Sequence, residues 1–367
     1  MIHWGDSGIR NTFSYEFVDN RTLESVGSAN EGVVEGGNLT ESWTSDLRQS
    51  GSLTISGLDK SIPFNYGIRI FHTAEQSGED PFTEELATLL VDSTSYNYNK
   101  GVYDVNVDLK SMLWRLETDE YPWDSNVDGS TKILSRFTSI IRASSGFPKI
   151  DASLNGDYWE NKTFGQSHVW QVGDTVLDEC QRCAEAIGGY LDVDTHGRVI
   201  LKKYVYPGDK EPIAIIQNDS QNAILDSGMQ VDYEDIVNRV YATYEKDDQT
   251  WYSVKSLDAS HPWSFQHIGR QAAEQVSVTS IEDGDDVQAK LDEAVNSRLR
   301  ELKVMTRTFS INMLYNPNVR AGEMISLIFK DSPNSDGENI KAYVVDRNIK
   351  LDSTMSMDVT LREVRNV

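Results

Sequence analysis

A strict alternation of apolar and polar residues, repeated at both ends of the chain, constrains the fold most. The segments 12–17, 52–56, 102–109 and 355–361 all follow it. A period of two puts every second side chain on one face of an extended strand, so that one face packs on a core and the other meets water. The sequence therefore predicts strands with one buried face near both termini.

The middle of the chain has a different pattern, which is typical of helices. Apolar residues recur three or four positions apart in two segments, and a short alternating hairpin follows them. The predicted elements are a helix over 129–141, a helix over 176–187 with Asp174 as its N-cap and Gly188 after its end, and hairpin strands at 189–193 and 199–204. Together they indicate a small α+β module.

The length of the chain predicts more than one domain. At 367 residues it exceeds what a single hydrophobic core usually organises. The predicted fold class is mainly β with an α+β insert. Its expected parts are a first β domain at 1–120, the α+β module at 121–205, a connecting segment at 206–235, and a second β domain at 236–367 that contains a helix at 285–303.

The order of elements from Ile224 to Leu361 carries a family resemblance. The succession is a strand with the letters NRVYATY, a short strand at 251–254, the segment HPWS…IGR, a helix from near 285, a strand at 305–313, the segment NPNVRAGEMISL, and two alternating strands. This order resembles that of the tail hub proteins of tailed bacteriophages, the baseplate hub and tail-associated proteins, which are kin to the hubs of type VI secretion spikes.

The resemblance implies a structural protein of the virion, made in the host cytoplasm. It implies two tube-like β-barrel domains per chain, and a homotrimeric ring that matches a sixfold tail tube to threefold tip components around the path of DNA ejection. The implied partners are the tail tube and distal tail proteins, the tape measure protein, and tip spike or fibre proteins.

The charge of the chain excludes some partners. The formal net charge is −24, from 58 acidic and 34 basic residues. Gripping nucleic acid or an anionic membrane requires clustered Lys and Arg, so neither sequence-specific nucleic-acid binding nor membrane insertion is expected. No apolar run is long enough for a membrane span, and no secretion signal is expected. The acids either keep the outer surface soluble or face a channel, where they repel DNA.

Motifs with catalytic or metal-binding chemistry are weak. Cys180 and Cys183 form a CxxC on the apolar stripe of the second helix, which favours burial over zinc or redox chemistry. Residues 124–129 match the opening of a calcium loop, but Ser135 stands where its bidentate Glu is needed, and an acidic turn explains the segment as well. We therefore predict no catalytic, cofactor-binding or metal-binding residues, no cofactor, and no enzymatic activity.

Two alternative functions stay open from the sequence. A tail-associated cell-wall-degrading enzyme would need a pair of converging carboxylates, and no pair stands out among the 58 acids. A glycan-binding receptor module would need clustered aromatic side chains, whereas the tryptophans are scattered along the chain.

Overall fold

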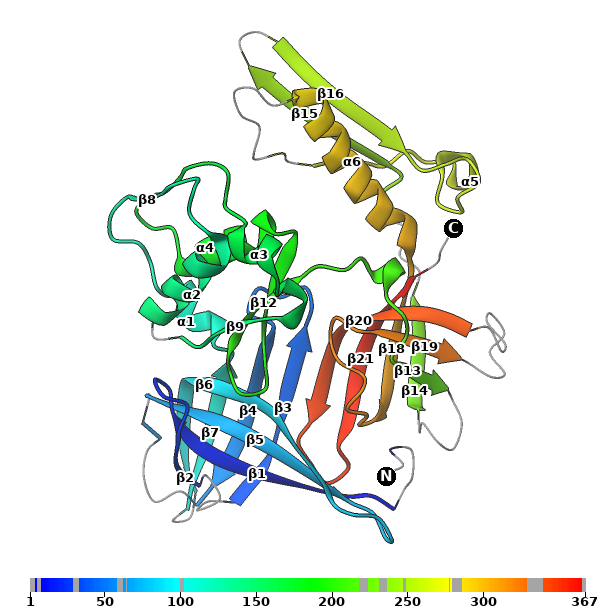
Figure 1. Cartoon of the computed structure of the whole chain (residues 1–367). Coiled ribbons are helices and arrows are strands. Elements are labelled where there is room, and N and C mark those ends of the chain that lie inside the picture. The colour runs from blue at the N-terminus through cyan, green and yellow to red at the C-terminus, as the bar shows by residue number, and fades with distance from the viewer. Residues whose placement is uncertain are drawn as a thin grey trace.

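The fold is mainly β, as predicted, and the helices of the described residues lie in two places in the chain (Figure 1). The computed structural model describes residues 4, 8–28, 33–57, 62–63, 65–99, 102–144, 146–217, 224–230, 236–246, 249–276, 278, 286–328 and 339–364.

One sheet joins strands from the two ends of the chain. Its amino-terminal strands are β1 (Arg10–Asp19), β2 (Ser25–Ser28), β3 (Val33–Ser42), β4 (Gln49–Ser56), β5 (Tyr66–Glu75), β6 (Phe82–Asn99) and β7 (Val102–Lys110). Its other strands are β13 (Ala214–Gln217), β14 (Ile224–Gln230), β18 (Met305–Leu314), β19 (Met324–Ile328), β20 (Asn339–Lys350) and β21 (Ser356–Val364). The alternating segments predicted near the termini lie in these strands, except that Met355 precedes β21.

The seam of the sheet is the antiparallel pair β3–β20, where Leu39 lies opposite Ile349. The strand order is β14-β18-β21-β20-β3-β4-β7-β6-β5-β1-β2, and β19 with β13 branches from β20. Among the described strands the sheet does not close, so the prediction of two β-barrels is wrong for the single chain. The reason is that β20 pairs with β19 along its first half and with β3 along its second half, which joins the two ends of the chain in one open sheet.

The segment 206–235, predicted as a connection, also contributes to the sheet. Within it, β13 pairs in parallel with β19, and β14 pairs antiparallel with β18. Its content of Pro and polar residues favours a connection, but Ile216 is fully buried in the core that both halves of the sheet share. Tertiary packing therefore outweighs local preference here.

The middle module has its own core. Its elements are α1 (Leu113–Glu117), β8 (Ser125–Val127), α2 (Ile133–Ala143), β9 (Pro148–Ile150), η2 (Ala152–Leu154), α3 (Asp157–Asn161), β10 (His168–Trp170), α4 (Val176–Ala186), β11 (Gly189–Val193), β12 (Val199–Lys203) and η3 (Pro207–Asp209). The two predicted helices are α2 and α4, whose apolar stripes are buried together. Helix α2 begins four residues later than predicted, because Asp128 accepts a hydrogen bond from the Ser130 backbone amide and forms a turn before it.

A third group of elements packs separately from the sheet. It contains β15 (Arg239–Lys246), β16 (Gln249–Ser256), α5 (Phe265–Ile268), β17 (Ala273–Gln275) and α6 (Val287–Val304). Helix α6 places Leu291 and Val295, from its predicted stripe, against Val240 and Ala242 of the hairpin. Figure 1 shows this group extending away from the sheet at the top of the view.

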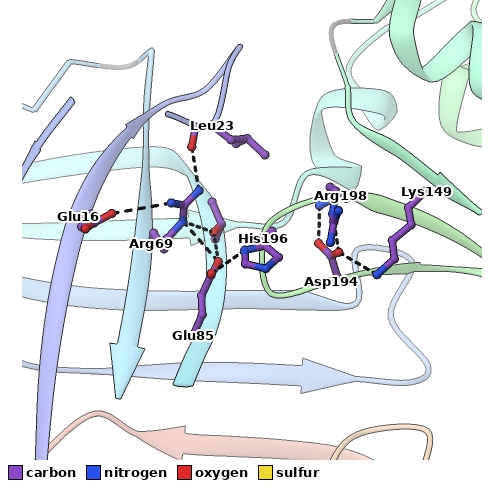
Figure 2. Close-up of polar contacts among 9 residues, drawn as sticks. Glu16, Leu23, Arg69, Glu85, Lys149, Asp194, His196 and Arg198 are labelled. Carbon is purple, nitrogen blue, oxygen red and sulfur yellow. Dashed lines mark hydrogen bonds and ion pairs between the residues drawn. The ribbon is translucent and has the colours of Figure 1, made fainter. Parts of the chain in front are cut away.

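A tight turn docks the middle module on the sheet (Figure 2). The β11–β12 turn brings His196 Nδ1 to 2.6 Å from Glu85 Oε2 on β6. Arg69 of β5 lies 3.4 Å from the same carboxylate and also donates to the Leu23 carbonyl. Burial, the largest effect, raises the pKa of Glu85 against the opposing influence of Thr88, His196 and Arg69.

The turn itself is held in shape by Asp194. Its carboxylate accepts hydrogen bonds from the Arg198 amide and guanidinium, both at 2.8 Å, and from Lys149 at 3.3 Å. Gly197 has a φ of +79°, and a Cβ on it would meet Met112 at 3.2 Å. The docking therefore requires glycine at this position.

Candidate functional site

Cys180 and Cys183 lie where the sequence predicts, fully buried on α4. Burial raises the pKa of the Cys183 thiol to about 12 and that of Cys180 well above its usual value. Both thiols are therefore protonated at neutral pH, unlike the thiolates that bind metals or attack disulfides.

The acidic segment before α2 acts as a turn. Asp124 accepts a hydrogen bond from the Val172 amide, and Asp128 accepts one from the Ser130 amide. In the parts of the chain that the structure describes, no cluster of three His, Cys, Asp or Glu residues could hold a metal ion. Among these same residues, no helix is long and apolar enough to cross a membrane.

One face of the sheet is covered by short polar side chains, and we call it the polar face. It runs from β14 across β18, β21, β20, β3, β4 and β7 to the second half of β6. The strand registers place the following residues on it: Asp226, Ser310, Asn312, Asp358, Thr360, Asp346, Asn348, Lys350, Asn38, Thr40, Ser50, Ser52, Thr54, Asp104, Asn106, Asp108, Ser93 and Ser95.

Hydrogen bonds between neighbouring strands tie these side chains together. Asn348 Oδ1 accepts from Asn38 at 3.1 Å and from Thr40 at 3.2 Å, across the seam between β20 and β3. Further along, Thr54 donates to Asn106 at 3.0 Å. Short side chains that satisfy one another lie flat on the sheet, so the polar face is even and hydrophilic.

Charge on the polar face is mixed with an acidic excess. The aspartates Asp104, Asp108, Asp226, Asp346 and Asp358 lie on it with Lys110, Lys350 and Arg362. Lys350 lies 3.8 Å from Asp358, and Lys110 lies 3.1 Å from Asp92, so two of the three cations are paired with acids.

The opposite face of the same sheet is apolar and buried. Leu53, Val107, Ile311 and Val359 alternate with the polar residues and belong to the shared core. The contrast between the two faces explains the period of two in the sequence.

A buried ion pair locks the seam from the core side. Arg347 of β20 donates to Glu41 of β3 at 2.7 and 2.6 Å, and to the Val319 carbonyl at 2.8 Å. Both side chains are almost fully buried. The pKa of Glu41 is lowered overall. Burial is the largest single effect and acts to raise this pKa, but the charge of Arg347 and its hydrogen bonds together outweigh burial.

The polar face ends at two strand edges. Within the described residues, β14 pairs only with β18, and β6 beyond Leu90 pairs only with β7. On the core side, Met229 of β14 and Tyr96 of β6 are 41% and 42% exposed. Both edges therefore offer backbone groups and apolar side chains to a neighbour.

No protein-family profile matches the sequence, and no curated protein matches it significantly. Solved structures do match. The tail protein from Neisseria meningitidis MC58 has a TM-score of 0.66 at 13% identity, over 96% of each chain. The 43 kDa tail protein of prophage MuSo2 from Shewanella oneidensis has a TM-score of 0.63 at 10% identity, over 96% of this chain and 98% of that one.

A chain of the half-lidded Francisella PdpA–VgrG complex matches as well, with a TM-score of 0.58 at 11% identity, over 98% of this chain and 59% of that one. The fold is therefore that of phage tail proteins. More particularly, the predicted resemblance to tail hubs and their type VI secretion relatives is confirmed at the level of the fold.

Proposed function

We propose that this protein is a structural hub of a phage tail tip, in which three copies form a ring and the polar face lines the DNA channel. The observation that carries the proposal is the polar face itself. It spans both halves of the chain as one continuous surface. The fold shared with phage tail proteins supports the same conclusion.

The chemistry of the polar face suits the passage of DNA. Its aspartates repel phosphates, and two of its three cations are occupied by acids, so few phosphate contacts would form and break as DNA slides. Screening limits such repulsion to roughly 8 Å at physiological salt, so the side chains on the wall decide it. This supports the hypothesis that the acidic excess faces the channel.

Ring closure would use the two strand edges. If β14 of one copy lies beside the second half of β6 of the next, the polar faces continue around the channel. Met229 and Tyr96 then become buried on the outer side. Each contact is between two different surfaces, and such contacts form a closed ring when the rotation between copies allows it.

Native mass spectrometry of the purified chain, with a particle image of the assembled tail tip, tests the ring. We expect a trimer and a channel lined by β3, β4, β20 and β21. A single copy at the centre of an assembled tip, or a channel lined by another face, would contradict the proposal.

The edges are tested separately by cross-linking. Gly228→Cys and Asn97→Cys place one thiol on each edge, while Cys180 and Cys183 stay buried. A short bismaleimide should link copies of the double variant and leave both single variants unlinked. A trimer that forms no cross-links would agree with the proposed hub but would refute this pairing of edges.

The ring would join a sixfold tail tube, with its distal tail proteins and tape measure protein, to the threefold spike or fibre proteins of the tip in the virion. In this role the chain has no catalytic activity. Zymography on cell-wall preparations checks this, and a cleared band that depends on the protein would contradict it.

A further inference from the structure

A cavity of about 500 Å³ lies where the sheet, the middle module and the third group of elements meet. Tyr343, Val345 and Arg362 line it from the sheet, Tyr204 from the position directly after β12, and Trp263 from the third group. Its volume is in the range of sites that bind small ligands or short peptide ends. Of the polar-face residues named above, Arg362 lines it, whereas Met229 and Tyr96 at the strand edges do not.

The apolar part of the cavity wall is aromatic and aliphatic. Trp43 packs edge-on against Tyr343, with ring centroids 5.7 Å apart, and Ile236, Leu257 and Leu302 complete the apolar lining. Such a lining accepts a large apolar side chain.

The charge of the lining is opposite to that of the protein. Three arginines and one glutamate line the cavity, in a chain with 58 acidic and 34 basic residues. Arg298 is held by Glu274 and Glu301. Arg307 is held by Glu363.

Arg362 differs from these two arginines. It is exposed, and the described part of the chain offers it no hydrogen bond or ion pair. It is therefore available to an anionic group, which a guanidinium binds best as a carboxylate or phosphate, through two parallel hydrogen bonds.

Tyr343 supplies a second polar group. It lies directly opposite Arg362 on the neighbouring strand, and its hydroxyl is buried with no hydrogen-bond partner in the structure. Burial raises the pKa of Tyr343, so the hydroxyl keeps its proton and can donate a hydrogen bond. A buried donor without an acceptor costs about 1–3 kcal/mol. The hydroxyl oxygen is covered in the structure, so a ligand oxygen relieves that cost only after a neighbouring side chain shifts.

We propose that this cavity binds the carboxyl-terminal residue of a partner polypeptide, when that residue is apolar. Arg362 and the Tyr343 hydroxyl bind the terminal carboxylate, and Trp43 and its apolar neighbours surround the side chain. A terminal apolar residue supplies both groups that the lining can bind, a carboxylate for Arg362 and an apolar side chain for the aromatic and aliphatic wall. The inference does not depend on the trimer or on the channel.

Fluorescence anisotropy of a fluorescein-labelled Ala-Ala-Leu-Phe peptide with the full chain tests the inference. We expect saturable binding, and at least tenfold weaker binding of the same peptide with an amidated carboxyl terminus. Arg362→Ala should weaken binding by a similar factor. Arg300→Ala is the matched control, since Arg300 lies on α6 outside the cavity and pairs with Asp209, and binding should be unchanged.

Tyr343→Phe separates recognition from folding. Since the hydroxyl has no partner within the protein, the melting temperature should stay the same or rise, while peptide binding weakens severalfold. Equal affinity for the acid and amide peptides, or no saturable binding of either, would overturn the inference. Displacement of the peptide by a single-stranded oligonucleotide that depends on Arg362 would also overturn it, by identifying a phosphate site.

Discussion

Glu41→Gln at the seam should destabilise the protein strongly. The change leaves the Arg347 guanidinium, which is 1% exposed, in the core without its counter-charge. Two hydrogen bonds to a carboxylate, at 2.6 and 2.7 Å, become at most one to a neutral amide. Removing one partner of a buried ion pair costs about 3–5 kcal/mol, a large part of the roughly 5–15 kcal/mol that stabilises a typical protein.

Urea unfolding followed by tryptophan fluorescence measures this loss, because Trp43 lies two residues beyond Glu41. Asp209→Asn is the matched control. It removes the acid from the exposed pair with Arg300, for which about 0–1 kcal/mol is expected. Replacing both core partners together, Glu41→Leu with Arg347→Met, should recover most of the loss, because no charge stays buried.

The same pair predicts a dependence on pH. The pKa of Glu41 is lower in the folded protein than in the unfolded chain, so its contribution to stability is complete above the unfolded pKa of about 4.5 and is lost as the pH falls through the folded value. Glu41→Gln should therefore lose less stability on acidification than the natural chain. A cost below about 1 kcal/mol for Glu41→Gln at neutral pH, or equal acid sensitivity of both proteins, would refute the reasoning.

Further predictions concern the middle module, a turn and the polar face. Replacing Cys180 and Cys183 together with Ala should cost about 1–3 kcal/mol in urea unfolding, as small cavities do, and elemental analysis should find no stoichiometric zinc in the natural chain. Gly322→Ala should lower the melting temperature clearly, since φ is +87° and the new Cβ would lie 2.6 Å from the Trp43 ring; an unchanged value would contradict this. Thr54→Lys should leave stability within about 0.5 kcal/mol but make the assembled ring retain DNA in a salt-dependent manner, whereas Thr54→Glu should not. DNA retention by neither or by both variants, measured by filter binding, would contradict the assignment of the polar face.

Local patterns predicted much of the fold, because strands with one buried face and amphipathic helices are properties of neighbouring residues. The start of α4 shows the limit of such reasoning. Asp174 was the predicted N-cap, but its carboxylate accepts from the Gln171 amide, and Thr175 caps the helix in a reciprocal pair with Asp178. Both residues are good caps, and only the course of the preceding loop decides between them.

The polar face and the seam could not be derived from the sequence. Glu41 and Arg347 are 306 residues apart, and nothing in either segment indicates the other. Small polar residues on alternating positions predict a solvated face, but they do not show that the faces of two distant regions form one surface. The cavity lining also comes from several distant segments, which explains why Arg362 did not stand out as a candidate.

The seam sets the order of events during synthesis. Arg347 of β20 is synthesised 306 residues after Glu41 of β3, its partner in the seam. Until β20 is synthesised, β3 has an unpaired edge and Glu41 has no counter-charge. The strands that precede β20 can therefore form only an incomplete sheet. Long-range pairing of this kind is slow and leaves a nascent chain prone to wrong partners. Because the continuous polar face exists only after β20 docks, a copy that is still being translated cannot present that surface for assembly.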